Sequence, residues 1–219
     1  MLTDLIIAGA GGTSRELAEV VEAINKVSPR FNLLGFLDDD PVKAGLQVDG
    51  YPVLGAMARV KDFPQAQVII GAANSKNPAV RQQIADRLAL PDLRYTTLVD
   101  PSAFVSRHTR LGAGSAVLQN VVLSHNTTVG RHVLIGQTAS VAHDIILEDY
   151  STIAPGCVVS GFVMVGPAAY LGAGSSLLPR VRIGAGALVG LGAVVMTDVP
   201  GGATVVGNPA RLMPNLKAG

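Results

Sequence analysis

The residues of this sequence best suited to move protons are its four histidines, because imidazole titrates close to neutral pH. His143 is followed directly by Asp144, and a neighbouring carboxylate can fix the tautomer of an imidazole and support its protonated form. The sequence contains no G-x-S-x-G motif, so no serine nucleophile of that type is indicated. What the histidines can do depends on the elements that position them.

A strict six-residue repeat surrounds these histidines and has to be explained before any local secondary structure. From Val105 to Val195 every sixth residue is Val, Leu or Ile, and the residue two positions earlier is small or β-branched. The residue directly after the aliphatic one is often glycine, which suits a corner where φ is positive or backbones crowd.

A period of six fits neither the α-helix nor an alternating strand that ends in varied loops. It fits a coil of three short strands joined by tight corners, with the aliphatic residue and its small partner both pointing inward. Successive coils then pair with one another in a solenoid. We therefore predict a hexapeptide parallel β-helix over this part of the chain.

The coil of eighteen residues places His125 one coil before His143 on the same corner, with neighbouring strands roughly 4.8 Å apart. Two imidazoles this close disfavour double protonation, which suits His143 to act as a base. A solvent-facing corner residue is the alternative for His125. One coil further on, Gly161 leaves space above His143 and can offer its N–H. His108 and His132 fall one residue later in the repeat and are predicted to lie on the surface.

Residues 1–100 follow a different pattern, which predicts a small Rossmann-like βαβ domain, with the β-helix and a tail over residues 101–219. Buried parallel strands are expected at 5–8, 31–37 and 68–71, a shorter edge strand at 51–55 and a last strand at 95–99. Helical periodicity predicts helices at 14–24 and 78–88.

The loops after the first, second and third buried strands are expected to meet at one edge of that sheet, where ligands bind in such folds. The glycine-rich stretch 9–14 can present backbone N–H groups to a phosphate, although Ser14 stands where the full dinucleotide fingerprint has glycine. Asp38 and Asp39 can accept hydrogen bonds from ribose hydroxyls or from a base edge; a solvated acidic turn is the alternative. Asn74 belongs to the third loop.

Composition narrows the class of protein further. The formal net charge is +1 and no Lys/Arg cluster is present, which argues against a nucleic-acid or membrane-surface partner. No apolar run approaches the roughly 18 residues needed to span a bilayer, and no signal peptide is visible, so we expect a cytoplasmic protein. The single cysteine, Cys157, falls on the inward small-residue position and is predicted to be buried.

Several segments together resemble one family over essentially the whole chain: the strand–GAGGTS–helix start, FLDDDP, IIGAAN, LVDPSAFVS, the hexad array and the terminal GNPA. This family is the bacterial nucleotide-sugar acetyltransferases related to PglD, PerB, VioB and NeuD, which are hexapeptide-repeat acyltransferases with a left-handed β-helix. The left-handedness is implied by the resemblance and not by the spacing. The segment 140–144 resembles the catalytic stretch of the family, which implies His143 as general base and Asp144 as its supporting carboxylate.

The resemblance implies an acetyl-CoA-dependent N-acetyltransferase that acts on a nucleotide-linked amino sugar, an NDP-4-amino-4,6-dideoxyhexose, for surface glycan biosynthesis. It implies direct attack of the amine on the thioester, a homotrimer with active sites between subunits, and no metal. Positions for acetyl-CoA are Gly161, Gly172, Ala173, Gly190 and Leu191. Positions for the nucleotide sugar are Gly9, Gly11, Gly12, Thr13, Asp38, Asp39, Asn74 and His125.

One position departs from the family pattern, and two other functions remain open. Related enzymes carry a second histidine where this chain has Thr152, so no catalytic role is assigned to Thr152. The first alternative is a sugar O-acetyltransferase of the sialic-acid type. The second is a non-catalytic trimer that binds a nucleotide sugar. The sequence leaves UDP, dTDP and GDP equally open as the nucleotide.

Overall fold

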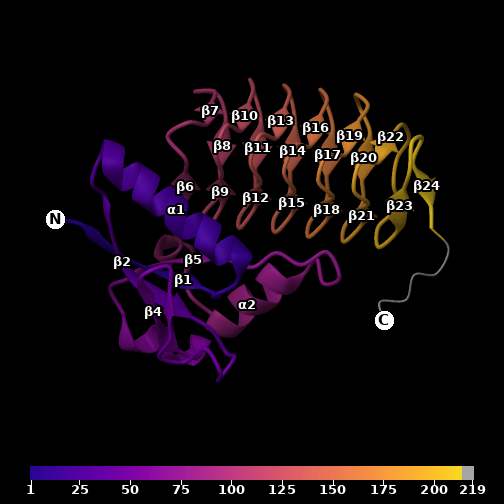
Figure 1. Ribbon diagram of the computed structural model, residues 1–219. Helices are drawn as coiled ribbons and strands as arrows, with labels where there is room; N and C mark the ends of the chain where they lie inside the picture. Colours follow the sequence, from indigo (N-terminus) through magenta and orange to yellow (C-terminus); the bar gives the residue numbers. More distant parts are fainter. Residues whose placement is uncertain (214–219) are drawn as a thin grey trace.

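The computed structural model describes residues 1–213 and shows an α/β domain followed by a long parallel β-helix (Figure 1). The predicted fold class is therefore confirmed. Residues 214–219, the end of the predicted tail, lie outside the described part of the chain. The predicted division into two domains at residue 100 stays a prediction, and β6 (Leu98–Val99), just before it, already pairs with a strand of the β-helix.

The N-terminal part is a five-stranded sheet with the order β3-β4-β2-β1-β5, in which only β3 runs antiparallel to its neighbour. Leu5 to Ala8 of β1 are fully buried because helices or the β-helix cover both faces of the central strands. The bounds are β1 (Thr3–Ala8), α1 (Gly12–Val27), β2 (Phe31–Leu37), β3 (Gln47–Val48), β4 (Tyr51–Gly55), η1 (Met57–Asp62), β5 (Gln67–Ile70), α2 (Val80–Leu88) and η2 (Asp92–Arg94). The strand predicted at 95–99 is wrong in part, since Tyr95 makes only an isolated bridge to Val68.

The β-helix is built from three sheets, which the chain visits in turn, and their strands run parallel except for the last strand of the covered face. The covered face is formed by β6 (Leu98–Val99), β9 (Ala116–Val117), β12 (Leu134–Ile135), β15 (Thr152–Ile153), β18 (Tyr170–Leu171), β21 (Leu188–Val189), β23 (Thr204–Val206) and β24 (Arg211–Leu212). The second face is formed by β7 (Phe104–Val105), β10 (Val122–Leu123), β13 (Ser140–Val141), β16 (Val158–Val159), β19 (Ser176–Leu177) and β22 (Val194–Val195). The third face is formed by β8 (Arg110–Leu111), β11 (Thr128–Val129), β14 (Ile146–Leu147), β17 (Met164–Val165) and β20 (Arg182–Ile183).

The six-residue repeat builds the core of this β-helix as predicted. In the register between β10 and β13, Val122 lies opposite Ser140 and Leu123 opposite Val141, so each coil repeats after eighteen residues. Leu123 and Val141 are fully buried, whereas Val105 in the first full coil is only partly buried. Cys157 is buried on an inward position, where burial raises the pKa of its thiol. It packs as a core residue, as predicted.

The three corners of each coil use glycine mainly for close approach of neighbouring coils. A Cβ atom on Gly130, for example, would lie 2.7 Å from the backbone nitrogen of Asp149 in the next coil. The left-handed backbone conformation occurs instead two residues later in the corner, where Asn126 and Asp144 both have φ of 56°. The first corner joins the covered face to the second face, the second corner joins the second to the third, and the third corner returns to the covered face.

The N-terminal domain packs on the covered face, and Figure 1 shows it on the side of β6, β9 and β12, with β7, β10 and β13 on the other side. A buried arginine of α2, Arg81, joins the two parts. Arg81 is 2% exposed, and its guanidinium donates hydrogen bonds to the carbonyls of Ala72, His132, Tyr150 and Ser151 and to the hydroxyl of Thr152. Because these groups belong to both parts, Arg81 ties the loop after β5 to the third corner.

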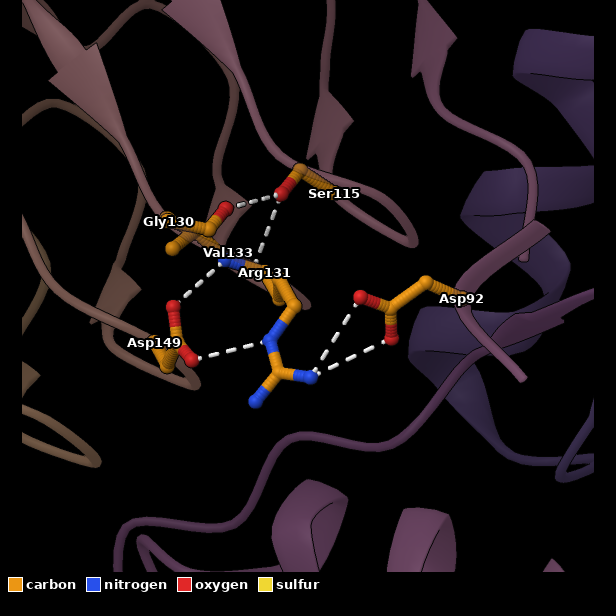
Figure 2. Close-up of polar contacts among 6 residues, drawn as sticks. All are labelled: Asp92, Ser115, Gly130, Arg131, Val133 and Asp149. Atoms are coloured by element: carbon orange, nitrogen blue, oxygen red, sulfur yellow. Dashed lines mark hydrogen bonds and ion pairs between the residues drawn. The ribbon is translucent and has the colours of Figure 1, made fainter. Parts of the chain in front are cut away.

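A second, exposed link is centred on Arg131 in the third corner (Figure 2). Its guanidinium lies 3.0 Å from Asp149 in the next coil and 3.1 Å from Asp92 of η2. Next to it, the hydroxyl of Ser115 donates to the carbonyl of Gly130 at 2.7 Å and so connects the coil of Arg131 with the coil before it. Arg131 therefore connects η2 with the β-helix at the exposed edge of the interface between the two parts. Arg81 connects the same two parts in the buried centre of this interface.

The prediction that His132 lies on the surface is wrong. Its side chain is buried, stacked on Tyr150 with ring centroids 5.1 Å apart and edge-on to Tyr95 at 4.4 Å. The N-terminal domain covers the third corner at this coil, which the local repeat does not encode. Burial, together with the positive charges of Arg131 and Arg81, lowers the pKa of His132 to about 4.

Candidate active site

A cavity of about 300 Å³ opens where β1, β2 and β5 end, as the sequence predicted for this edge of the sheet. Its lining includes six of the eight residues predicted to hold the nucleotide sugar, Gly9, Gly11, Gly12, Thr13, Asp38 and Asn74. The glycine-rich turn leads directly into α1, so backbone N–H groups at the helix N-terminus face the cavity. This arrangement can hold a phosphate group.

Asp38 lines the nucleotide cavity and is held in place by hydrogen bonds. Its carboxylate accepts hydrogen bonds from the backbone N–H of Ala10 at 2.8 Å and of Asp40 at 2.9 Å, and from the ammonium of Lys43 at 2.9 Å. Partial burial alone would raise the pKa of Asp38, but these donors outweigh burial and leave the pKa below its ordinary value. Asp38 is therefore ionised at neutral pH and fixes the glycine-rich turn.

Lys43 lines the same cavity and was not predicted from the sequence. Its ammonium forms an ion pair with Asp38, and its side chain is about one third exposed, so it remains accessible to a bound anion. The sequence signal for Lys43 is a cationic side chain five residues after Asp38, just beyond the FLDDDP segment.

Asp39 lies outside the nucleotide cavity, although the sequence placed it with Asp38. Its carboxylate accepts a hydrogen bond from the backbone N–H of Met57 at 2.9 Å and pairs with Arg87 at 2.8 Å. It lines a separate hollow beside α2. Because consecutive side chains at the end of a strand point to opposite sides, only one of the two acids can reach the cavity.

A second cavity of about 220 Å³ lies between α1 and the first corner of the β-helix. It shares Thr13 and Ala73 with the nucleotide cavity, so the two are neighbours. Thr152 lines it as well, and the hydroxyl of Thr152 accepts a hydrogen bond from Arg81. Thr152 stands in β15 on the covered face, whereas His143 follows β13 on the second face, so the two side chains do not form one cluster.

His143 and Asp144 form a hydrogen-bonded pair in the second corner. The Nδ1 atom of His143 lies 2.8 Å from the Oδ2 atom of Asp144, which leaves Nε2 as the ring nitrogen available to a substrate. The side chain of His143 is 55% exposed, so a reacting group can reach it. Hydrogen bonds from Asn126 and His143 lower the pKa of Asp144, and its carboxylate is therefore charged at neutral pH.

The next coil shapes the surroundings of His143. A Cβ atom on Gly161 would lie 2.9 Å from Cε1 and 3.1 Å from Nε2 of His143, so only glycine fits there without moving the imidazole. Phe162 contacts the same ring edge-on, with centroids 5.2 Å apart, and the guanidinium of Arg180 covers Phe162 at 4.7 Å. These contacts hold one side of the imidazole.

His125 lies one coil before His143, as predicted, and its carbonyl accepts a hydrogen bond from the N–H of Asp144 at 3.0 Å. Its ring contacts the ring of His108, with centroids 4.5 Å apart. Both histidines are exposed, as predicted for His108. His125 stands at the second corner and not in the nucleotide cavity.

The remaining positions predicted for acetyl-CoA lie in the first corner. Gly172 and Ala173 follow β18, and Gly190 and Leu191 follow β21, both on the covered face. Gly172 and Gly190 are needed for close packing, since a Cβ on either would lie within 3 Å of a neighbouring coil. Leu191 is 79% exposed. Of the five positions predicted for acetyl-CoA, only Gly161 lies beside His143 of the same chain.

The two halves of the candidate site therefore stand apart in one chain. The nucleotide cavity is lined by the N-terminal domain, and the second cavity lies between that domain and the covered face and first corner of the β-helix. His143 stands on the second corner, which is the edge of the β-helix opposite the covered face. In the described part of the chain, no helix is long and apolar enough to cross a membrane. Within residues 1–213, no three His, Cys, Asp or Glu side chains are grouped to hold a metal ion.

The hexapeptide β-helix, with an exposed His–Asp pair in one corner, places this chain in the class of the hexapeptide-repeat acyltransferases. Family models agree: the one described as the PglD N-terminal domain matches residues 4–88, and the bacterial transferase hexapeptide model matches residues 126–161. A GDP-perosamine N-acetyltransferase from Escherichia coli O157:H7 is 36% identical over 94% of this chain and 95% of its own. The chain thus belongs to the bacterial nucleotide-sugar acetyltransferases, as the sequence predicted.

Solved structures of acetyltransferases also resemble this chain over nearly its whole length. The acetyltransferase domain of PglB from Neisseria gonorrhoeae FA1090, in complex with acetyl coenzyme A, matches with a TM-score of 0.86 and 29% identity, over 97% of this chain and 100% of that one. PerB from Caulobacter crescentus, in complex with CoA and GDP-perosamine, matches with a TM-score of 0.82 and 27% identity, over 98% of this chain and 99% of that one.

Proposed function

We propose that this protein transfers the acetyl group of acetyl-CoA to the amino group of a nucleotide-linked amino sugar, with His143 as the general base. The observation that carries the proposal is the exposed His143–Asp144 pair on a chain that also has a phosphate-type cavity at a glycine-rich turn. The sugar amine attacks the thioester carbonyl, Nε2 of His143 accepts the amine proton, and CoA leaves as its thiol. Asp144 supports the imidazolium while the proton is held there.

The nucleotide sugar is proposed to span the two neighbouring cavities. Its diphosphate binds at Gly11, Gly12 and the N-terminus of α1, with the ammonium of Lys43 adding positive charge. The sugar extends past Thr13 into the cavity at the first corner, which Thr152 lines. Asp39 has no part in this scheme, because it pairs with Arg87 outside the cavity.

A homotrimer with active sites between subunits completes the proposal. His143 of one chain cannot reach the cavities of the same chain across the β-helix, so a neighbouring copy has to supply it. Apolar side chains on the second face and second corner are exposed, as expected for a surface that contacts another copy: Phe104, Val122, Val158, Phe162 and Leu178 are between 39% and 61% exposed. In such a trimer, the first corner of one subunit, with Gly172 and Gly190, and the second corner of the next would enclose acetyl-CoA.

The acceptor is proposed to be an NDP-4-amino-4,6-dideoxyhexose, and a GDP-linked sugar is the first candidate. The support is the likeness to relatives named for GDP-perosamine, in sequence and in structure. UDP- and dTDP-linked amino sugars are the comparison set, because Asp38 and Lys43 can contact any nucleotide through its ribose or phosphates.

The test is the release of free CoA thiol from acetyl-CoA in the presence of UDP-, dTDP- and GDP-linked 4-amino sugars, for the wild type and for His143→Ala. We expect strong turnover of one amino sugar and a loss of about 10² to 10⁴ in kcat for the variant, the usual contribution of a general base. Turnover only with hydroxyl acceptors would show sugar O-acetylation instead. Turnover that survives in His143→Ala would exclude His143 as the base.

A further inference from the structure

Four residues occupy the left-handed position of the second corner in successive coils, next to His143. They are Asn126, Asp144, Phe162 and Arg180, with φ of 56°, 56°, 63° and 68°. We call these four residues the corner column. Asparagine and aspartate tolerate this conformation more readily than other side chains do, so backbone geometry alone could account for Asn126.

The side chain of Asn126, however, makes a specific contact. Its Nδ2 atom donates a hydrogen bond to Oδ1 of Asp144 at 2.5 Å, while Oδ2 of the same carboxylate lies 2.8 Å from Nδ1 of His143. Each carboxylate oxygen therefore has its own partner. The Asn126 amide fixes the rotation of the carboxylate, and the carboxylate fixes the ring of His143.

Apart from Asn126 and His143, no side chain in the described part of the chain donates a hydrogen bond to Asp144. The side chain of Asp144 is about one third exposed, so without Asn126 its carboxylate can turn toward water. On the far side of the imidazole, Phe162 and Gly161 already limit the position of the ring. Asn126 supplies the matching constraint through Asp144.

We propose that Asn126 is a positioning residue of the acetyl transfer, which acts through Asp144 to hold His143 in its reactive orientation. The proposal rests on the function proposed above. In this proposal, the side chains of Asn126, Asp144 and His143, from two neighbouring coils, form one chain of hydrogen bonds. Asn126 touches neither substrate nor cofactor in this scheme.

The first experiment compares Asn126→Gly with Asn120→Gly. Asn120 has the same φ of 56° and is exposed on the first corner, so both variants relax the same backbone position. Asn126→Gly should lower kcat about tenfold, less than the loss of the base itself, with little change in the KM for the nucleotide sugar. Asn120→Gly should keep wild-type kcat. Full activity of Asn126→Gly would overturn the proposal, because only the backbone would then matter.

The second experiment uses Asn126→Asp and its pH dependence. At neutral pH the new carboxylate faces Asp144 and cannot donate, whereas at lower pH the two acids share one proton, and this proton restores a donor to Asp144. The ratio of variant to wild-type kcat/KM should therefore rise several-fold as the pH falls from about 8 to about 5. If the ratio of variant to wild-type kcat/KM does not change over this range, the positioning role of Asn126 is contradicted.

The function itself is tested separately in the same assay. If His143→Ala keeps wild-type turnover, the proposed function fails and the positioning role fails with it. If His143→Ala is inactive while both Asn126 variants behave like the wild type, only the positioning role fails. Thermal unfolding of each variant shows whether lost activity reflects lost folding, and Asn126→Gly should melt at the wild-type temperature or above.

Discussion

At the scale of single residues, the candidate base is defined by the groups that lie next to it in the neighbouring coils. Gly161 makes room for the imidazole of His143 in one coil, and Asp144 holds it from the same corner. The imidazole of His143 therefore depends on the space that Gly161 leaves as well as on its hydrogen bond with Asp144. We therefore expect a glycine in this position to matter for the reaction as well as for the packing.

Replacement of Gly161 by alanine tests this point. The new Cβ would lie 2.9 Å from Cε1 of His143, so the ring has to move. We expect kcat to fall by about 10², the loss that a misplacement near 1 Å can cause. The control is Gly201→Ala, whose Cβ would lie 3.2 Å from the nearest atom, a carbonyl far along the chain from His143. Equal activity of both variants would show that the imidazole of His143 can move away from the new methyl group without loss of function.

Residue types in the sequence predicted part of this site and missed part of it. The eighteen-residue coil correctly placed His125 and Gly161 on either side of His143. The same spacing relates Asp144 to Asn126, but the spacing alone does not show that these two side chains contact each other. Asp38 and Asp39 could not be separated, because which acid faces the cavity depends on the exact end of β2.

At the scale of elements, the third corner of the β-helix differs between the coils that the N-terminal domain covers and the coils beyond it. His132 illustrates the difference, since the six-residue repeat predicts an exposed corner residue and the structure buries it between Tyr95 and Tyr150. Long-range contacts of this kind leave no local pattern. The repeat predicts the core of the β-helix well, and it predicts nothing about the elements that pack against its outside.

Burial of His132 has a consequence for stability at low pH. Its pKa is about 4 in the folded protein against an ordinary value of 6.5, so the unfolded chain binds a proton first as the pH falls. The free energy of unfolding should therefore decrease between pH 6.5 and about 4, by up to about 3 kcal/mol. Arg131 and Arg81 face the ring and add to this effect, while Asp92 and Asp149 oppose it.

Urea unfolding of the wild type and His132→Phe checks this expectation at one protein concentration. Phenylalanine keeps the aromatic contacts with Tyr95 and Tyr150 but cannot titrate. The stability difference between the two proteins should grow in favour of His132→Phe as the pH falls from 7 to 4.5. A difference that does not vary with pH would mean that the folded protein accommodates the imidazolium.

At the scale of the whole molecule, one chain carries its cavities and its proposed base on different sides of its β-helix. The cavities lie in the N-terminal domain and between this domain and the first corner, whereas His143 belongs to the second corner. The family resemblance predicts a site shared between copies, and this remains a proposal. A shared site could not be foreseen from the repeat, because a period of six says nothing about which corner the N-terminal domain approaches.

Mixing two inactive variants tests whether neighbouring chains share the site. Thr13→Trp should block the passage between the two cavities, and His143→Ala removes the base. Trimers assembled from equal amounts of both, after denaturation and refolding together, should recover about a quarter of wild-type activity, since each site draws its halves from two chains of a cyclic ring. Each variant refolded alone should stay inactive. A mixture with no recovered activity would place both halves of the site in one chain.

The eighteen-residue register between coils has a further consequence for how such a protein can change its length. Insertion of a single residue within a coil would turn every later side chain from the inside to the outside, so the fold tolerates growth or shrinkage in the stack only by whole coils. Each added coil moves the later coils by roughly 4.8 Å along the axis. The distance between His143 and the far end of the β-helix can therefore change only in steps of one coil.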